Sequence, residues 1–414
     1  MPVAIGPWIY IHAAAYLNSW TPPMFDNASR APALPPQPST APAKQQGASL
    51  PASQAAARSA SFPAIDMLRA VAALLVLVYH VIALGNWQNT PPDSGIWRVL
   101  HRGWIGVDLF FVISGFVIAW SALHAHSKQG TGFRQEFARR RFWRIVPLYA
   151  LTSLVFLFLV QPGMLLVPIN VLLIHILSHV FFVHNLHPGT FGSINGVTWS
   201  VALEVQFYLL VLVITPWIAK TRPLLGLTIA VMVALCYRYI TTLISVPGAA
   251  GVTVHHQLVA ATQLPGVIDQ FACGMFLAVV LKRREGLLYP WLTVGWRNFA
   301  AWSLLSGVML AASLNLLVSY SCWDRSAMIV LWRPLLTLGM TALVAAAICF
   351  PWASLRLLSP LRYLGEISYG IYLWHLLVLH VLKTHVTLIQ GHSLLNHVLV
   401  ITVVMSAFSW HAFA

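Results

Sequence analysis

Ten apolar segments, each about as long as a helix that crosses a bilayer, dominate this chain. A spanning helix needs about 20 mostly apolar residues, and within lipid a helix pairs its backbone groups inside one segment. The fold class is therefore predicted to be an all-α integral membrane protein with about ten transmembrane helices. We expect them near 65–85, 104–123, 143–161, 199–219, 223–243, 264–281, 299–319, 330–350, 361–382 and 394–413.

The charge content agrees with lipid as the surrounding solvent. Only 8% of residues are charged and 58% are hydrophobic, whereas a soluble domain carries about 25% charged residues. The net charge of +14 would suggest nucleic acid in a soluble protein. Here the basic residues lie mostly in loops between apolar segments. Their positions are explained by the excess of Lys and Arg that membrane proteins carry in cytoplasmic loops. We expect the lipid bilayer, and no nucleic acid, as a partner.

An eleventh apolar segment, 164–184, is interrupted by Pro168, Asn170, His175 and His179. With ten spans and a cytoplasmic N-terminus, cytoplasmic loops hold fourteen Lys and Arg residues and the other side holds five. Counting 164–184 as a span would move later basic residues outside, against the positive-inside rule. We therefore predict a re-entrant or interfacial segment near 164–198 on the outer side, with both termini cytoplasmic.

The first 61 residues form a separate region. Residues 1–61 are rich in Pro, Ala, Ser and Gln, a composition that buries too little apolar surface to order itself. The region lacks a basic stretch followed by a continuous apolar core, so we expect no cleaved signal peptide. We predict a disordered cytoplasmic tail at 1–61 and one polytopic membrane domain at 62–414.

Ionisable side chains inside spans need an explanation, because each costs about 2.5–3.5 kcal/mol on insertion scales. The first span, IDMLRAVAALLVLVYHV, contains Asp66, Arg69 and His80. Arg69 and His80 are eleven residues apart, which is about three helical turns and about 16 Å along one face. A snorkelling arginine and a packed histidine would be the structural alternative. We favour a functional stripe, cationic near the cytoplasm and imidazole toward the far side.

Three further polar side chains are expected toward the outer half of the membrane. Asp108 lies in GWIGVDLFFVISGF, Glu204 in TWSVALEVQFYLL and His375 in GEISYGIYLWH. A carboxylate is a common partner that fixes the tautomer of an imidazole. We predict a polar layer formed by His80, Asp108, Glu204 and His375, in which Asp108 or Glu204 orients the His80 ring or positions the acceptor.

A basic stretch, FARRRFWRIVP, precedes the third span on its cytoplasmic side. It contains Arg139, Arg140, Arg141 and Arg144. Membrane anchoring or anionic lipid explains any one of them, but four within six positions exceed that need. Arg141 and Arg144 are one turn apart, so two guanidinium groups can grip one phosphorylated group.

The histidines outside these motifs show no metal pattern. His175 and His179 have i,i+4 spacing without an evident third ligand. We expect no metal.

Together these motifs resemble the membrane acyltransferase-3 family. The resemblance rests on IDMLRAVAALLVLVYH, GWIGVDLFFVISGF, RRRFWRIVPLY, TWSVALEVQFYLL and GEISYGIYLWH, and it covers about residues 62 to 414. It implies transfer of an acyl group, usually acetyl, from cytoplasmic acyl-CoA to a hydroxyl of a glycan or another acceptor. The family's Arg-x10-His, Arg-x-x-Arg and acidic positions fall on Arg69 with His80, Arg141 with Arg144, and Glu204.

The resulting prediction is a membrane O-acyltransferase of the bacterial-type plasma membrane, in which His80 is the general base. A covalent acyl-histidine intermediate remains the alternative chemistry. The acceptor would be a glycan or a lipid-linked saccharide of the cell envelope. The predicted residues are His80, Arg69, Asp108 and Glu204 for catalysis, Arg69, Arg140, Arg141 and Arg144 for acyl-CoA, and Glu204, His375, Tyr372 and Trp199 for the acceptor.

A proton-coupled transporter of an anionic or sugar substrate is the competing hypothesis, because buried acidic and histidine residues also form proton relays. The Arg141 and Arg144 pair, combined with the stripe from Arg69 to His80, favours the transferase. The chain ends at SAFSWHAFA, without the aromatic–Glu–Pro ending common in the family and without a following hydrolase-like domain. We expect a stand-alone enzyme, without a fused hydrolase-like domain.

Overall fold

The computed structural model describes residues 62–85, 91, 93–244, 253–320, 326–351, 358–386 and 389–413. Within these ranges the regular structure is helical and contains no strand, so the predicted all-α class is confirmed. The described residues from Pro63 onward belong to one compact unit. The predicted tail, 1–61, lies outside them.

Nine helices of the described part are long and apolar enough to cross a membrane, and the chain is a multi-pass membrane protein. Each corresponds to one of the segments expected from the sequence. They are α3 (Pro63–Leu84), η2 with α5 (Gly103–Ile105 and Gly106–Gln129), α6 with the π-helical η4 (Phe133–Val155 and Phe156–Val160), α8 (Thr198–Ile218), α9 (Pro223–Ile244), α11 (Leu264–Arg283), α12 (Trp296–Ser319), η8 with α13 (Met328–Trp332 and Arg333–Cys349) and α16 (Gly391–Phe413).

The tenth expected span, 361–382, differs from the prediction. It is divided into α14 (Ser359–Glu366) and α15 (Ser368–His385). Gly365 at the end of α14 lies so close to α3 that an added Cβ would be 1.7 Å from the Asp66 carbonyl oxygen. The segment is therefore not one continuous helix, and Gly365 beside the break packs against α3, which is distant in the sequence. The 18 residues of α15 still extend about 27 Å.

The segment 164–198 contains no helix long enough to cross. Its longest helix, α7 (Ile169–Val180), has 12 residues and measures about 18 Å, against about 30 Å of hydrocarbon. This agrees with the prediction that 164–184 is not a full span. Its position on the outer side stays a prediction.

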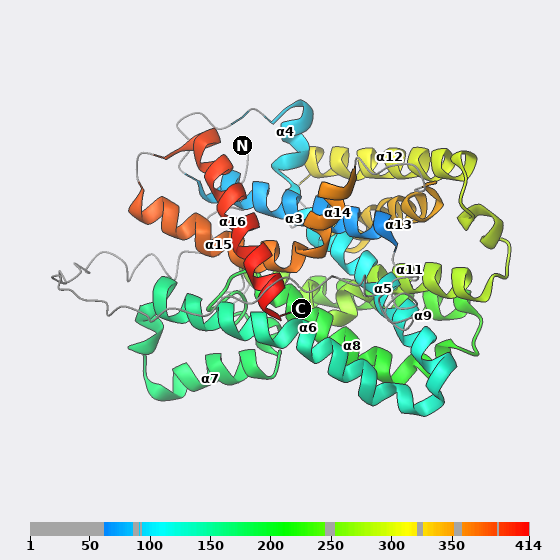
Figure 1. Cartoon of the computed structure of the whole chain (residues 1–414), viewed down its shortest axis with the longest axis horizontal. Coiled ribbons are helices and arrows are strands. Elements are labelled where there is room, and N and C mark those ends of the chain that lie inside the picture. Colours follow the sequence, from blue (N-terminus) through cyan, green and yellow to red (C-terminus); the bar gives the residue numbers. More distant parts are fainter. Residues whose placement is uncertain are drawn as a thin grey trace, which may run out of the picture. The chain divides into compact units, whose positions relative to one another are not determined.

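Close packing centres on α5 and α11, which are the most buried of the nine helices. They approach at two glycines: a Cβ added to Gly115 would lie 2.0 Å from the Phe271 carbonyl oxygen, and one added to Gly274 would lie 1.9 Å from that of Val112. Small residues allow helix backbones to meet in this way within a membrane. Figure 1 shows α5 next to α11, and α12 alongside α13.

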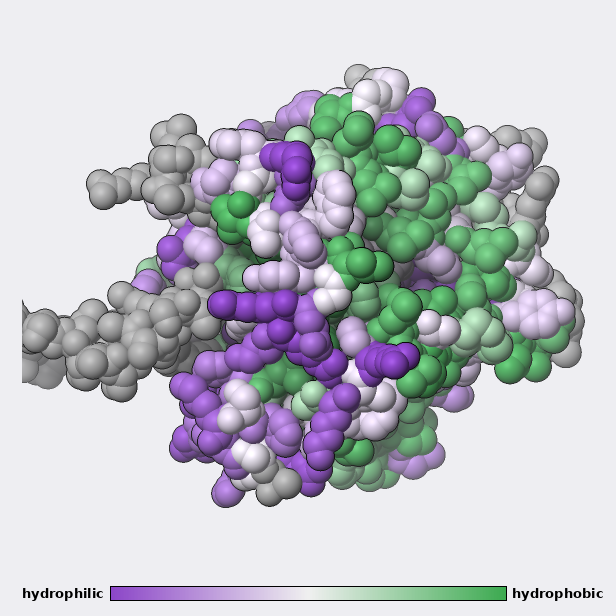
Figure 2. Space-filling model, turned by 90° about the vertical axis from the view of Figure 1, so that its right-hand side faces the viewer, coloured by the Kyte–Doolittle hydropathy of each residue, from purple (hydrophilic) through white to green (hydrophobic). Residues whose placement is uncertain are grey.

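The outward faces of the bundle are apolar. Only 11% of α12 and 22% of α16 is buried within the protein, so most of their apolar side chains face outward. Figure 2 shows one face of the molecule, with hydrophobic side chains over one part and hydrophilic side chains gathered beside them. This separation is the one expected where lipid covers part of the surface and water covers the rest.

Candidate active site

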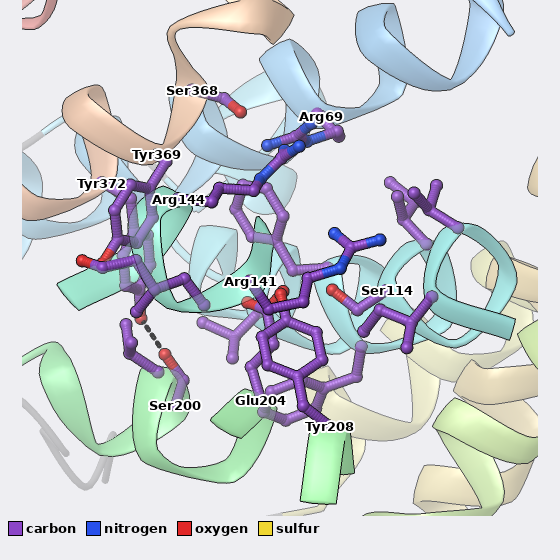
Figure 3. Close-up of a pocket in the computed structure, with 18 residues that line it drawn as sticks. Arg69, Ser114, Arg141, Arg144, Ser200, Glu204, Tyr208, Ser368, Tyr369 and Tyr372 are labelled. Atoms are coloured by element: carbon purple, nitrogen blue, oxygen red, sulfur yellow. Dashed lines mark hydrogen bonds between the residues drawn. The ribbon is translucent and has the colours of Figure 1, made fainter. Parts of the chain in front are cut away.

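A polar pocket lies between α3, α5, α6, α8 and the start of α15 (Figure 3). It brings together Arg141 and Arg144 of the basic stretch with Arg69 of the first span. Glu204 of the fourth span lies in the same pocket. These residues come from three motifs that are far apart in the sequence. The polar lining consists of Arg69, Ser114, Arg141, Arg144, Ser200, Glu204, Tyr208, Ser368, Tyr369 and Tyr372.

Positive charge is in excess in this pocket. The guanidinium of Arg69 is 4.0 Å from the Asp66 carboxylate. The guanidinium of Arg141 lies over the rings of Phe137 and Tyr208, 5.2 and 5.4 Å from their centroids. Arg144 forms no ion pair with a described residue. The three guanidinium groups outnumber the carboxylates of Asp66 and Glu204, and this excess favours an anionic ligand.

Glu204 belongs to the arginine pocket. The Tyr208 hydroxyl, one turn further along α8, donates a hydrogen bond to the Glu204 carboxylate. Figure 3 shows both side chains below Arg141. The structure thus pairs Glu204 with this tyrosine, and His80 does not line the same pocket.

The opposite wall of the pocket leads to the histidines. The Tyr372 hydroxyl lies 2.7 Å from the Ser200 hydroxyl and donates to the Val197 carbonyl at 3.1 Å. One turn along α15, the His375 ring is 6.0 Å from the Tyr372 ring, centroid to centroid. His375 in turn is next to His80, with ring centroids 5.0 Å apart. The two histidines do not line the pocket, and Tyr372 connects it to them.

The hydrogen bonds of the two histidines define their tautomers. His80 Nδ1 lies 2.9 Å from the Val76 carbonyl oxygen and 3.1 Å from His375 Nε2. His375 Nδ1 lies 3.2 Å from the Ile371 carbonyl oxygen. A carbonyl only accepts, so each Nδ1 carries the proton, and the Nε2 lone pair of His375 accepts from His80. His80 Nε2 then keeps its lone pair and bonds to no residue that the structure describes.

Asp108 does not contact the His80 ring, contrary to our expectation. Gln270 Nε2 donates to its carboxylate at 2.6 Å, and Arg333 Nε lies 3.6 Å from the same oxygen. The carboxylate is 4% exposed, and a buried carboxylate requires such partners. The partner that we expected for the His80 ring, a carboxylate, is replaced by His375.

Two other predicted residues lie outside the pocket lining. Arg140 is exposed and pairs with Glu136 at 2.6 Å, so three of the four arginines predicted for acyl-CoA line the pocket: Arg69, Arg141 and Arg144. The Trp199 ring packs against Phe111 and Phe191, with centroids 6.3 and 5.2 Å away.

A buried ion pair was missed in the sequence. Arg238 on α9 is fully buried, and its guanidinium donates to the Asp269 carboxylate at 2.9 Å and to the Gly266 carbonyl at 2.8 Å. The signal was present, since Arg238 is a charged residue inside an apolar segment. Its partner lies on α11, and the sequence does not place α9 beside α11.

Comparison with known proteins identifies the family. The sequence model of an acyltransferase domain matches residues 62–413. The chain belongs to this acyltransferase family. The described residues contain no group of three or more His, Cys, Asp or Glu side chains arranged to hold a metal ion. The family does not favour the transporter hypothesis.

Several curated acyltransferases are similar to the chain. A Bacillus subtilis protein named "Putative peptidoglycan O-acetyltransferase" is 29% identical over 371 residues, which cover 84% of this chain and 54% of the relative. The peptidoglycan O-acetyltransferase of Listeria monocytogenes is 28% identical over 340 residues, 76% of this chain and 48% of the relative. An acyltransferase of Streptomyces mycarofaciens is 27% identical over 340 residues, covering 78% and 80%.

Two of these relatives are longer than this chain. The chain spans about half the length of the two relatives named for peptidoglycan. No solved structure matches the chain.

Proposed function

We propose that this acyltransferase moves an acyl group, typically acetyl, from cytoplasmic acyl-CoA to a hydroxyl of an extracytoplasmic or membrane-associated glycan. The observation that carries the proposal is the arginine pocket, which is lined by three guanidinium groups and by Tyr372. The Tyr372 ring is 6.0 Å from that of His375, which is 5.0 Å from that of His80, centroid to centroid. The names of two similar proteins, which specify peptidoglycan O-acetylation, support a glycan acceptor.

The arginine pocket suits the phosphates of the donor. Guanidinium groups bind phosphate in a bidentate manner, and the pyrophosphate of CoA is such a ligand. Basic loop residues favour a cytoplasmic N-terminus in the plasma membrane of a bacterial-type cell. This orientation places Arg69 nearer the cytoplasm than His80, which lies about 16 Å further along α3. The thin pantetheine arm would then carry the thioester across part of the membrane.

His80 is the general base in this scheme. Its Nε2 lone pair takes the proton from the acceptor hydroxyl as the hydroxyl oxygen attacks the thioester carbonyl carbon. A carbon–oxygen bond forms and gives a tetrahedral intermediate. The intermediate then breaks its carbon–sulfur bond, and the CoA thiolate takes the proton from His80. The products are the acyl ester and free CoA, and His80 returns to its neutral form.

The experiment is acyl transfer by the full-length protein in lipid nanodiscs, with radiolabelled acetyl-CoA and cell-envelope glycan as acceptor. His80→Ala should lower kcat by about 10²–10⁴-fold, the usual contribution of a general base. His397→Ala is the matched control, because His397 is an exposed histidine on α16. Wild-type turnover by the His80 variant, in protein that reaches the membrane, would refute the assignment.

The donor and the acceptor are tested separately. Arg141→Ala should raise the KM for acetyl-CoA, because Arg141 lines the arginine pocket, and an unchanged KM would contradict the donor assignment. Mass spectrometry of surface glycans from a deletion strain should reveal a missing ester. The glycan that loses the ester is the acceptor.

A further inference from the structure

A second cationic site lies beyond the arginine pocket, at the ends of α5 and α11. Lys282 Nζ donates to His124 Nδ1 at 3.3 Å and lies 5.5 Å from the centroid of the Trp120 ring. Lys282 is half-buried and pairs with no described carboxylate, whereas the neighbouring Arg283 pairs with Glu285 at 3.5 Å. The ammonium therefore carries uncompensated charge. We call Trp120, His124 and Lys282 the α5–α11 cluster.

The α5–α11 cluster is held in place by packing beneath it. Arg283 donates to the carbonyl oxygens of Ile218 and Thr221, at 2.6 and 2.8 Å, and so ties the end of α11 to the end of α8. Leu123 and Val279 form a small core with Ile218. Trp120 supports the ammonium from the side through its ring face. Lys282 is thus positioned more firmly than a lysine on a free surface loop.

The α5–α11 cluster continues the line of the arginine pocket along α5. Val117 lines that pocket, and His124 follows it by seven residues, which is two helical turns on the same face and about 10 Å further along the axis. At the other end Phe110 packs against Tyr372, with ring centroids 5.8 Å apart. From Phe110 to His124 is about 21 Å along α5. Along one side of α5, Tyr372 is therefore followed by the arginine pocket and then by the α5–α11 cluster.

We infer that the α5–α11 cluster binds the 3′-phosphate of the donor CoA, an inference that rests on the proposed function. CoA carries phosphate at two separate places, the pyrophosphate and the ribose 3′-position, with the acyl thioester at the opposite end. The pocket arginines and Lys282 form two cationic groups in the corresponding order. His124 accepts at Nδ1 from Lys282, so its neutral ring carries the proton at Nε2. That N–H is a second donor for the phosphate.

The test compares two donors that differ only in this phosphate, acetyl-CoA and acetyl-dephospho-CoA. In nanodiscs, Lys282→Ala should raise the KM for acetyl-CoA by roughly tenfold or more, because a hydrogen bond to a charged group is lost. The KM for acetyl-dephospho-CoA should stay at the wild-type value, as should kcat with both donors. Lys282→Arg should keep most of the affinity. Lys220→Ala, a change at an exposed lysine after α8, is the control and should alter neither KM.

Any other result of the two-donor comparison rejects either the 3′-phosphate site or the proposed function. An equal rise for both donors, or no rise with acetyl-CoA, rejects the 3′-phosphate site. A Lys282 effect that appears with both donors and only in nanodiscs containing anionic lipid would assign the cluster to a lipid headgroup instead. A wild-type protein that neither binds nor turns over acetyl-CoA rejects the proposed function and this inference together. Calorimetric binding of CoA and dephospho-CoA to the wild type separates that case from the others.

Discussion

Replacing His375 should separate the roles of the two adjacent histidines. In the structure His80 Nδ1–H is shared between the Val76 carbonyl at 2.9 Å and His375 Nε2 at 3.1 Å. Loss of His375 leaves the Val76 bond, which still directs the proton to Nδ1. His375→Gln should therefore cost at most one neutral hydrogen bond, about 0.5–1.5 kcal/mol. That range corresponds to a fall of about 2- to 12-fold in kcat.

The prediction concerns the difference in lost activity between variants at His80 and variants at His375. His80→Ala removes the proton acceptor and should cost about 10²–10⁴-fold, far more than His375→Gln. Glutamine presents an oxygen that can accept from His80 Nδ1–H, so His375→Gln should be faster than His375→Ala. The assay is initial-rate acetyl transfer in nanodiscs over a range of pH. Because the base acts as the neutral imidazole, the rate should rise with pH through one ionisation, and this limb should persist in both His375 variants.

The opposite ranking would refute this reasoning. If His375→Gln lost as much activity as His80→Ala and also lost the rising limb of the pH profile, His375 would be the base and His80 its partner. The folded fraction is checked by size-exclusion chromatography of each variant. The conservative variant matters because His375 is only 1% exposed, and alanine there also leaves a cavity.

Two further predictions concern the scaffold, measured as thermal unfolding of the detergent-solubilised protein. Asp269→Asn should destabilise by about 3–5 kcal/mol because it leaves the Arg238 charge buried without its partner, and the double change Arg238→Met with Asp269→Leu should restore most of the loss. If the double variant were less stable than the single one, the pairing argument would be wrong. Gly274→Ala should lower the melting temperature sharply, since its Cβ would lie 1.9 Å from the Val112 carbonyl oxygen, whereas Gly307→Ala meets nothing within 4 Å. Equal melting temperatures for both glycine variants would contradict the close α5–α11 packing.

Hydrophobicity and single-helix periodicity account for what could be predicted from the sequence. Apolar length located the nine long helices, because lipid imposes the same requirement on each span independently. Helical spacing also placed Arg69 and His80 on one helix, since α3 runs unbroken from Pro63 to Leu84. These properties depend only on residues that are near one another in the sequence.

Contacts between helices could not be predicted in this way. His80 and His375 are 295 residues apart in the sequence, and neither segment alone indicates that the other is its neighbour. For the same reason a carboxylate was expected as the partner of His80, although Asp108 pairs with Arg333 and Gln270. Each of these pairings depends on which helices pack together.

The buried polar groups fall into two classes, and the difference supports the placement of the site. Asp269 and Asp108 are compensated by Arg238 and Arg333, respectively, so their charges are balanced within the scaffold. Arg141, Arg144 and Lys282 form no ion pair with a described carboxylate, and His80 Nε2 keeps an unused lone pair. A membrane protein that leaves charge uncompensated pays for it in stability. A ligand that brings phosphate to the cations and a hydroxyl to the imidazole would supply the partners that the scaffold omits.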